Sequence, residues 1–210
     1  MTNNDPMFKT VGQALFLAFI MEVSPPSVKG ATQLLIEDLM KQRYGEAPVP
    51  RGERGVNLIG ITPLELRGQC SMIRASVSDH LAGQERDAIW ARFGHQMTRA
   101  NGVRNLGDHY ASLCNTQHRE AIHALLWAIY VPGTRMHHNE TPRSYNERRK
   151  KRTSDWSLRA IEKEYCIGKN VLHRDQQMLR KICHGVEMLA QRKLEELFIN
   201  TGLVGEAGDA

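Results

Sequence analysis

The stretch WSLRAIEKEYCIGKNVLHRD, residues 156–175, reads as a helix, a turn and a second helix. Ser157 can cap the first helix, with Trp156 and Ile161 in the positions of a hydrophobic staple. Residues 166–168 include the glycine of a tight turn, and the second helix begins near Lys169. The apolar residues that the two helices would bury are Leu158, Ile161, Tyr165, Ile167, Leu172 and Leu179. Two amphipathic helices that only pack at a corner would show the same spacing.

The outer face of the second helix is rich in side chains that donate hydrogen bonds to base edges and phosphates. These are Lys169, Asn170, His173, Arg174 and Gln177. The stretch resembles the helix-turn-helix of bacterial and phage transcription regulators, whose usual pattern runs Ser-Leu-Arg-x-Ile-Ala-x-x-Phe-Gly-Val-Ser-x-x-Thr-Val-x-Arg. The matching residues are Ser157, Leu158, Arg159, Ile161, Tyr165, Ile167, Leu172 and Arg174. Glu162 stands where that family prefers alanine, and Cys166 stands in place of its turn glycine. The resemblance implies that the five donors read bases in double-stranded DNA, and that Ser157 and Arg159 contact phosphates.

Positive charge is concentrated around this stretch. Residues 143–181 hold 12 Lys or Arg against 5 Asp or Glu, a net charge of +7, while the other 171 residues carry −2. The segment from 131 to 155 has no apolar periodicity and contains the run Arg148, Arg149, Lys150, Lys151 and Arg152. It is either a solvated linker or a basic arm that contacts nucleic-acid phosphates, and both descriptions can hold together.

The rest of the chain follows a helical period. We expect helices over residues 7–22, 28–43, 63–81, 85–97, 105–113 and 117–130. The clearest helix start combines Thr62 as cap, Pro63 at the first helical position and Glu65 three residues after the cap. No segment alternates like a strand, so the sequence predicts an all-α fold: a multi-helix body, a C-terminal helix-turn-helix and a long final helix. Within that final helix, His184 and Gly185 are the candidate position for a kink or a break. The helix either packs back on the body or forms the seam of a homodimer.

Composition excludes several classes of protein. With 41% hydrophobic and 24% charged residues, the 210-residue chain is typical of a globular protein. Its longest apolar stretch, residues 11–21, is too short to span a bilayer, and the amino terminus lacks the features of a signal peptide. The four cysteines form no Cys-x-x-Cys pair, which favours reduced thiols in a cytoplasmic protein.

We expect no enzyme, no metal and no cofactor. His118 and His123 lie five residues apart, so on a helix they point about 140° apart and cannot share a metal ion. The motif at residues 137–140, His-His-Asn-Glu, lacks the downstream partners of a nuclease site. No phosphate-binding loop, nucleophile elbow or dinucleotide fingerprint occurs in the chain.

Three segments are predicted: a helical body over residues 1–131, a basic linker over 132–155, and the helix-turn-helix region with its final helix over 156–210. The small size and the C-terminal position of the motif resemble the late-gene antiterminators of the Q type. That resemblance implies binding near a late promoter and loading onto RNA polymerase paused with its σ factor, with the body as the polymerase-facing surface. The alternatives are a conventional repressor or activator that acts at initiation, and a DNA-packaging adaptor such as a small terminase subunit.

Overall fold

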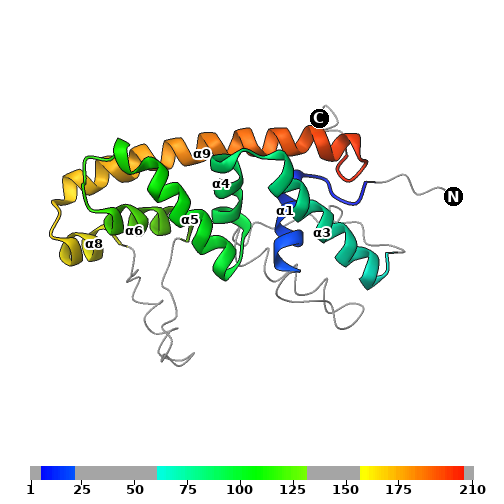
Figure 1. Cartoon of the computed structure of the whole chain (residues 1–210), viewed down its shortest axis with the longest axis horizontal. Coiled ribbons are helices and arrows are strands. Elements are labelled where there is room, and N and C mark those ends of the chain that lie inside the picture. Colours follow the sequence, from blue (N-terminus) through cyan, green and yellow to red (C-terminus); the bar gives the residue numbers. More distant parts are fainter. Residues whose placement is uncertain (1–5, 22–60, 132–156, 206–210) are drawn as a thin grey trace, which may run out of the picture. The chain divides into compact units, whose positions relative to one another are not determined.

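The computed structural model describes residues 6–21, 61–131 and 157–205 (Figure 1). These residues form seven α-helices and one short 3-10 helix, with no strand among them, so the all-α prediction is confirmed for this part of the chain. The helices are α1 (Val11–Ile20), α3 (Pro63–His80), α4 (Gly83–Phe93), α5 (Gln96–Tyr110), η1 (Ala111–Leu113), α6 (Arg119–Tyr130), α8 (Leu158–Tyr165) and α9 (Lys169–Asn200). The helix predicted over residues 28–43 lies outside the described residues. Of the described helices, none has the length and hydropathy needed to cross a bilayer.

The chain divides into two compact units, and the first contains α1, α3 and the end of α9. Its helix starts follow the sequence closely. Thr62 Oγ1 accepts a hydrogen bond from the backbone N–H of Glu65 at 3.2 Å, and a Glu65 carboxylate oxygen accepts one from the N–H of Thr62 at 2.7 Å. The predicted capping box is therefore present, and α1 begins with a second one made by Thr10 and Gln13. Arg74 on α3 donates a hydrogen bond to the carbonyl of Ala18 on α1 and so joins the two helices.

The second unit contains α4, α5, η1, α6, α8 and α9 up to Met188. Its core draws on every one of these α-helices. The fully buried members include Ala88 on α4, Leu106 on α5, Leu125 on α6, Ile161 on α8 and Leu172 on α9. Helices α8 and α9 thus bury their apolar faces in the same core as α5 and α6.

Two helix predictions differ from the structure. The sequence predicts helices over 85–97 and 105–113, whereas the structure has α4 over Gly83–Phe93 and α5 over Gln96–Tyr110. Gly102 lies inside α5, at the point where this helix crosses close to α4. A Cβ at residue 102 would lie 2.6 Å from the carbonyl oxygen of Asp87, so this glycine permits the close crossing and does not end a helix.

Helix α9 is one element of 32 residues. The long final helix is confirmed, and it is not divided at His184 and Gly185. A Cβ at residue 185 would have nothing within 4 Å, so packing does not require a glycine at this point.

Candidate nucleic-acid interface

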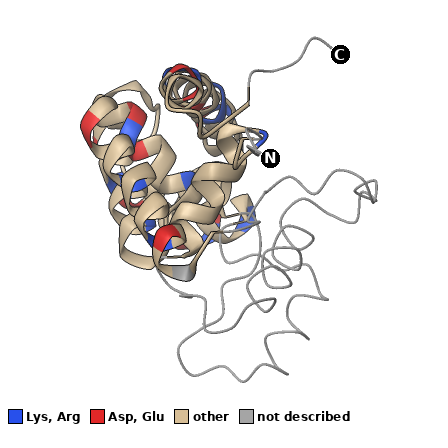
Figure 2. Cartoon of the chain, turned by 90° about the vertical axis from the view of Figure 1, so that its right-hand side faces the viewer, with Lys and Arg blue, Asp and Glu red and all other residues tan. Residues whose placement is uncertain are grey.

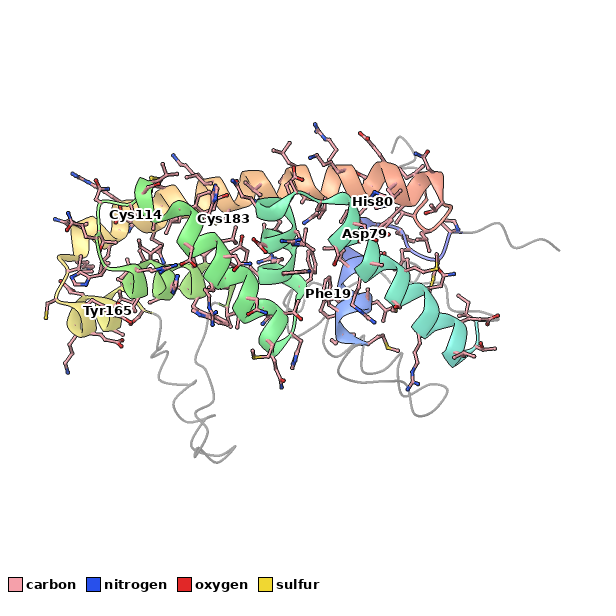
Figure 3. The ribbon with its side chains drawn as sticks, viewed as in Figure 1. Phe19, Asp79, His80, Cys114, Tyr165 and Cys183 are labelled. Carbon is pink, nitrogen blue, oxygen red and sulfur yellow. The ribbon has the colours of Figure 1, made fainter. Side chains whose placement is uncertain are left out.

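A three-residue turn joins α8 to α9. Ser157 Oγ accepts a hydrogen bond from the N–H of Ala160 at 3.2 Å and thereby caps α8. Helix α8 ends at Tyr165, which Figure 3 labels, and Cys166 follows in the left-handed conformation with φ 54° and ψ 35°. The carbonyl of Gly168 accepts hydrogen bonds from the N–H groups of Val171 and Leu172 in the first turn of α9. Cys166 therefore adopts the backbone conformation for which glycine is usually required.

The apolar residues predicted for the inner faces of α8 and α9 are buried or partly buried there. Ile161, Leu172 and Leu179 are fully buried, and Ile167 from the turn packs against the same core. Leu158 and Tyr165 are partly buried there as well. Glu162 is only half-buried, so a glutamate is accommodated where the family pattern has alanine.

The outer face of α9 carries the predicted base-reading residues. All five are exposed: Lys169, Asn170, His173, Arg174 and Gln177. At about 100° per residue they fall within an arc of about 140° around the helix axis. The Nε2 atoms of His173 and Gln177, one turn apart, lie 2.9 Å from each other and hydrogen-bond. The structure therefore brings these five side chains together on one face.

Three further donors continue this face and were not predicted. Arg180, Lys181 and His184 are exposed and fall within the same arc, about one to two turns beyond Gln177 on α9. We call the full set of eight residues the outer stripe; its members are Lys169, Asn170, His173, Arg174, Gln177, Arg180, Lys181 and His184. Extending the helical period beyond Gln177 would have found the additional three.

The charge of α9 changes along its length. Residues 169–186 hold four Lys or Arg and one acidic residue, Asp175, which is fully buried. Residues 187–200 hold two basic and three acidic residues, and Figure 2 shows blue and red together on this helix. The outer stripe therefore presents positive charge without an exposed carboxylate on its own stretch of helix, which favours a polyanionic ligand.

Asp175 lies opposite the outer stripe and holds α9 to the segment before α6. Its Oδ1 accepts hydrogen bonds from the N–H of Asn115 at 2.9 Å and from Asn115 Nδ2 at 2.7 Å. Its Oδ2 accepts a hydrogen bond from the N–H of Thr116, also at 2.9 Å. This role was not predicted from the sequence. The available signal was an aspartate at a position of the helical period otherwise held by Leu172, Leu179 and Cys183.

The remaining predicted residues have different outcomes. Arg159 is exposed on α8, and Ser157 is half-buried with its hydroxyl group occupied as the helix cap. The basic run Arg148, Arg149, Lys150, Lys151 and Arg152 lies outside the described residues, as does the His-His-Asn-Glu motif at 137–140. The division into 1–131, 132–155 and 156–210 stays a prediction.

Polar side chains elsewhere in the described residues form ion-pair clusters rather than metal centres. In the described ranges no group of three or more His, Cys, Asp or Glu residues could hold a metal ion. His123 Nε2 lies 3.1 Å from Asp108 Oδ1, which also accepts a hydrogen bond from Arg119 Nε at 2.6 Å. His123 therefore belongs to an ion-pair cluster between α5 and α6.

All four cysteines are free. Burial raises the pKa of Cys70, Cys114 and Cys183 to about 11, so these three are neutral thiols near pH 7. Cys114 precedes α6 and Cys183 lies on α9 (Figure 3).

A search of protein-family models and a search of curated proteins both give no match to this chain.

Proposed function

We propose that this chain binds double-stranded DNA at specific sequences and regulates transcription. The observation that carries the proposal is the division of α9 into two opposite faces. One face buries Leu172, Asp175 and Leu179 completely, while the other exposes all five predicted base-reading side chains.

The shape and chemistry of this face suit the major groove. An α-helix fits the groove, which is about 12 Å wide, and the second helix of a helix-turn-helix contacts bases through its first turns. Within those turns, Asn170 has the amide that pairs with adenine and Arg174 has the guanidinium that pairs with guanine. The left-handed turn at Cys166 and the buried Ile161 and Leu172 are consistent with the family pattern.

Phosphate contacts would surround the base contacts. Arg159 on α8 and the pair Arg180 and Lys181 on α9 are exposed cations on either side of the five base-reading residues in the sequence. With the basic run at 148–152 they supply the sequence-independent part of the affinity. Each phosphate contact should contribute a slope of about −0.9 in log affinity against log salt concentration.

The first experiment selects a preferred duplex from a random library and measures affinity by fluorescence anisotropy. Asn170→Ala and Arg174→Ala should each weaken binding to the selected duplex about 5- to 150-fold, with far smaller losses on a scrambled duplex. Arg67→Ala, which removes an exposed arginine from α3, is the matched control and should bind normally. Equal losses on both duplexes, or no preference for any sequence by the wild type, would contradict sequence-specific reading by this face.

A second experiment tests the phosphate contacts. Neutralising Arg148, Arg149, Lys150, Lys151 and Arg152 together should weaken binding to all sequences alike and flatten the salt slope. An unchanged slope would assign this run to a linker without a role in binding.

Within this function we propose action on elongating RNA polymerase, as the resemblance to late-gene antiterminators of the Q type suggests. A protein partner for the first unit is favoured by two apolar side chains of α3 that are largely exposed. The exposed fraction is 77% for Leu64 and 60% for Met72. Transcription in vitro on a template with the selected site and a downstream terminator tests this step. Readthrough that disappears when the site is scrambled supports antitermination. Altered initiation with normal termination would instead indicate a conventional repressor or activator.

A further inference from the structure

A fully buried carboxylate on the inner face of α9 has no part in the DNA contacts proposed above. Asp175 is 0% exposed and accepts three hydrogen bonds, two from backbone N–H groups and one from the side chain of Asn115. All three donors belong to Asn115 and Thr116, about 60 residues earlier in the chain. Burying a carboxylate costs free energy unless hydrogen bonds compensate, so these contacts are required by the burial itself.

The position of Asp175 around the helix is informative. Taking about 100° per residue, Asp175 lies about 170° from the middle of the arc formed by Lys169, Asn170, His173, Arg174 and Gln177. The apolar contacts of Leu172 and Leu179 hold α9 against the core without directional preference. Hydrogen bonds are directional, and the two oxygens of Asp175 are bound separately, so the carboxylate restricts rotation of α9 about its axis.

Small rotations matter at the outer face. A side-chain end lies about 6 Å from the helix axis, so a rotation of about 20° moves it by about 2 Å. Hydrogen bonds to base edges tolerate only a few tenths of an ångström in length. Contacts with phosphates through long flexible side chains are less demanding.

We infer that Asp175 is a positioning residue, which fixes the rotation of α9 through Asn115 and Thr116 so that the five base-reading side chains of the outer stripe meet base edges in register. This inference rests on the proposed function. It makes the segment before α6 a determinant of sequence discrimination, although that segment need not touch DNA.

The test uses the full-length chain and the ratio of affinities for the selected and the scrambled duplex. Asp175→Asn keeps the size of the side chain but turns an N–H donor toward a backbone N–H donor. The ratio should fall about tenfold or more, while affinity for the scrambled duplex changes little. Asn115→Ala removes only the side-chain donor of an exposed residue and should cause a smaller fall. This milder variant keeps the test decisive if Asp175→Asn does not fold.

Asp87→Asn is the matched control, since Asp87 is a buried aspartate of the same unit on α4. Circular dichroism first establishes that each variant is folded at the assay temperature. An unchanged ratio in folded Asp175→Asn and Asn115→Ala, or an equal fall in Asp87→Asn, would overturn the inference while leaving the proposed function intact. A wild-type protein with no sequence preference would instead refute the proposed function, and the inference with it.

Discussion

Replacing Gly102 by alanine should destabilise the second unit, although alanine is the better helix former. The added Cβ would lie 2.6 Å from the carbonyl oxygen of Asp87 and 2.7 Å from the backbone nitrogen of Ala91. Both neighbours are backbone atoms of α4, so no side-chain rotation relieves the contact. Restoring an ordinary separation of about 3.5 Å from both atoms requires α4 and α5 to move apart by about 0.9 Å.

The expected magnitude combines two opposing effects. Overpacking of this kind costs about 1–3 kcal/mol, and separation from the backbone of α4 places Gly102→Ala near the upper end. The higher helix propensity of alanine relative to glycine offsets this cost by about 1 kcal/mol in the free energy of unfolding. The net loss in free energy of unfolding should be about 2 kcal/mol.

Gly185→Ala provides the matched control. Gly185 is also inside a helix of the second unit, but a Cβ added there would have nothing within 4 Å, so this variant should gain about 0.5–1 kcal/mol. Urea unfolding followed by tryptophan fluorescence measures both changes, since Trp90 and Trp127 lie in this unit. Gly102→Ala should unfold at lower urea concentration than the wild type, and Gly185→Ala at higher concentration. A Gly102→Ala protein as stable as the wild type would refute the close crossing of α4 and α5.

Three further experiments test other parts of the structure. Burial alone would raise the pKa of Asp108, but hydrogen bonds from Arg119 and His123, together with the charges of these two residues, lower it below its ordinary value. For Asp87 the effect of burial is larger than that of the hydrogen bond from Asn105, so the pKa of Asp87 is raised. Asp108→Asn should therefore lower the free energy of unfolding at neutral pH, and this loss should shrink as the pH falls below 3.8. Asp87→Asn should instead raise the free energy of unfolding at every pH above the elevated pKa of Asp87. Free energies of unfolding that vary with pH in the same way in both variants would contradict this contrast. Iodoacetamide at pH 8 should label Cys166 in the folded protein much faster than Cys70, Cys114 or Cys183. Equal rates by mass spectrometry would contradict the burial of Cys70 and Cys183 and the partial burial of Cys114. Cys166→Gly should raise the free energy of unfolding by about 0.5–1 kcal/mol in urea titrations, because glycine adopts the left-handed conformation without the penalty of a side chain; a loss of stability would argue against that conformation.

Local signals in the sequence predicted local structure well. The start of α3 follows from Thr62, Pro63 and Glu65 because a capping box involves only residues three apart. The undivided helix α5 was missed because Gly102 is an unfavourable residue in a helix considered alone. The glycine at residue 102 is explained by the close approach of α4. This is a contact between separate helices, which no local sequence pattern reveals.

At the candidate interface, too, local features were predicted and a contact between distant residues was missed. Helical period alone predicted which side chains of α9 face outward, since Leu172 and Leu179 fix the buried side. Asp175 was missed because its partners, Asn115 and Thr116, lie in a segment whose position depends on the fold of the whole second unit. A buried acid whose partners lie far away in the sequence appears in a sequence only as a polar residue at an apolar position.

The packing of α8 and α9 bears directly on where sequence preference would be encoded. Ile161 and Leu172 are buried in one core with Leu106, Ile122 and Leu125 of α5 and α6, and Glu187 on α9 pairs with Arg92 on α4 at 3.5 Å. The outer stripe is therefore presented by a helix whose inner face is held by α4, α5 and α6 as well as by α8. If α9 reads DNA, its orientation is set by this shared core and by the hydrogen bonds to Asp175. Changes that repack α5 or α6 should then alter sequence preference without touching any residue of the outer stripe, because they move the helix that carries it.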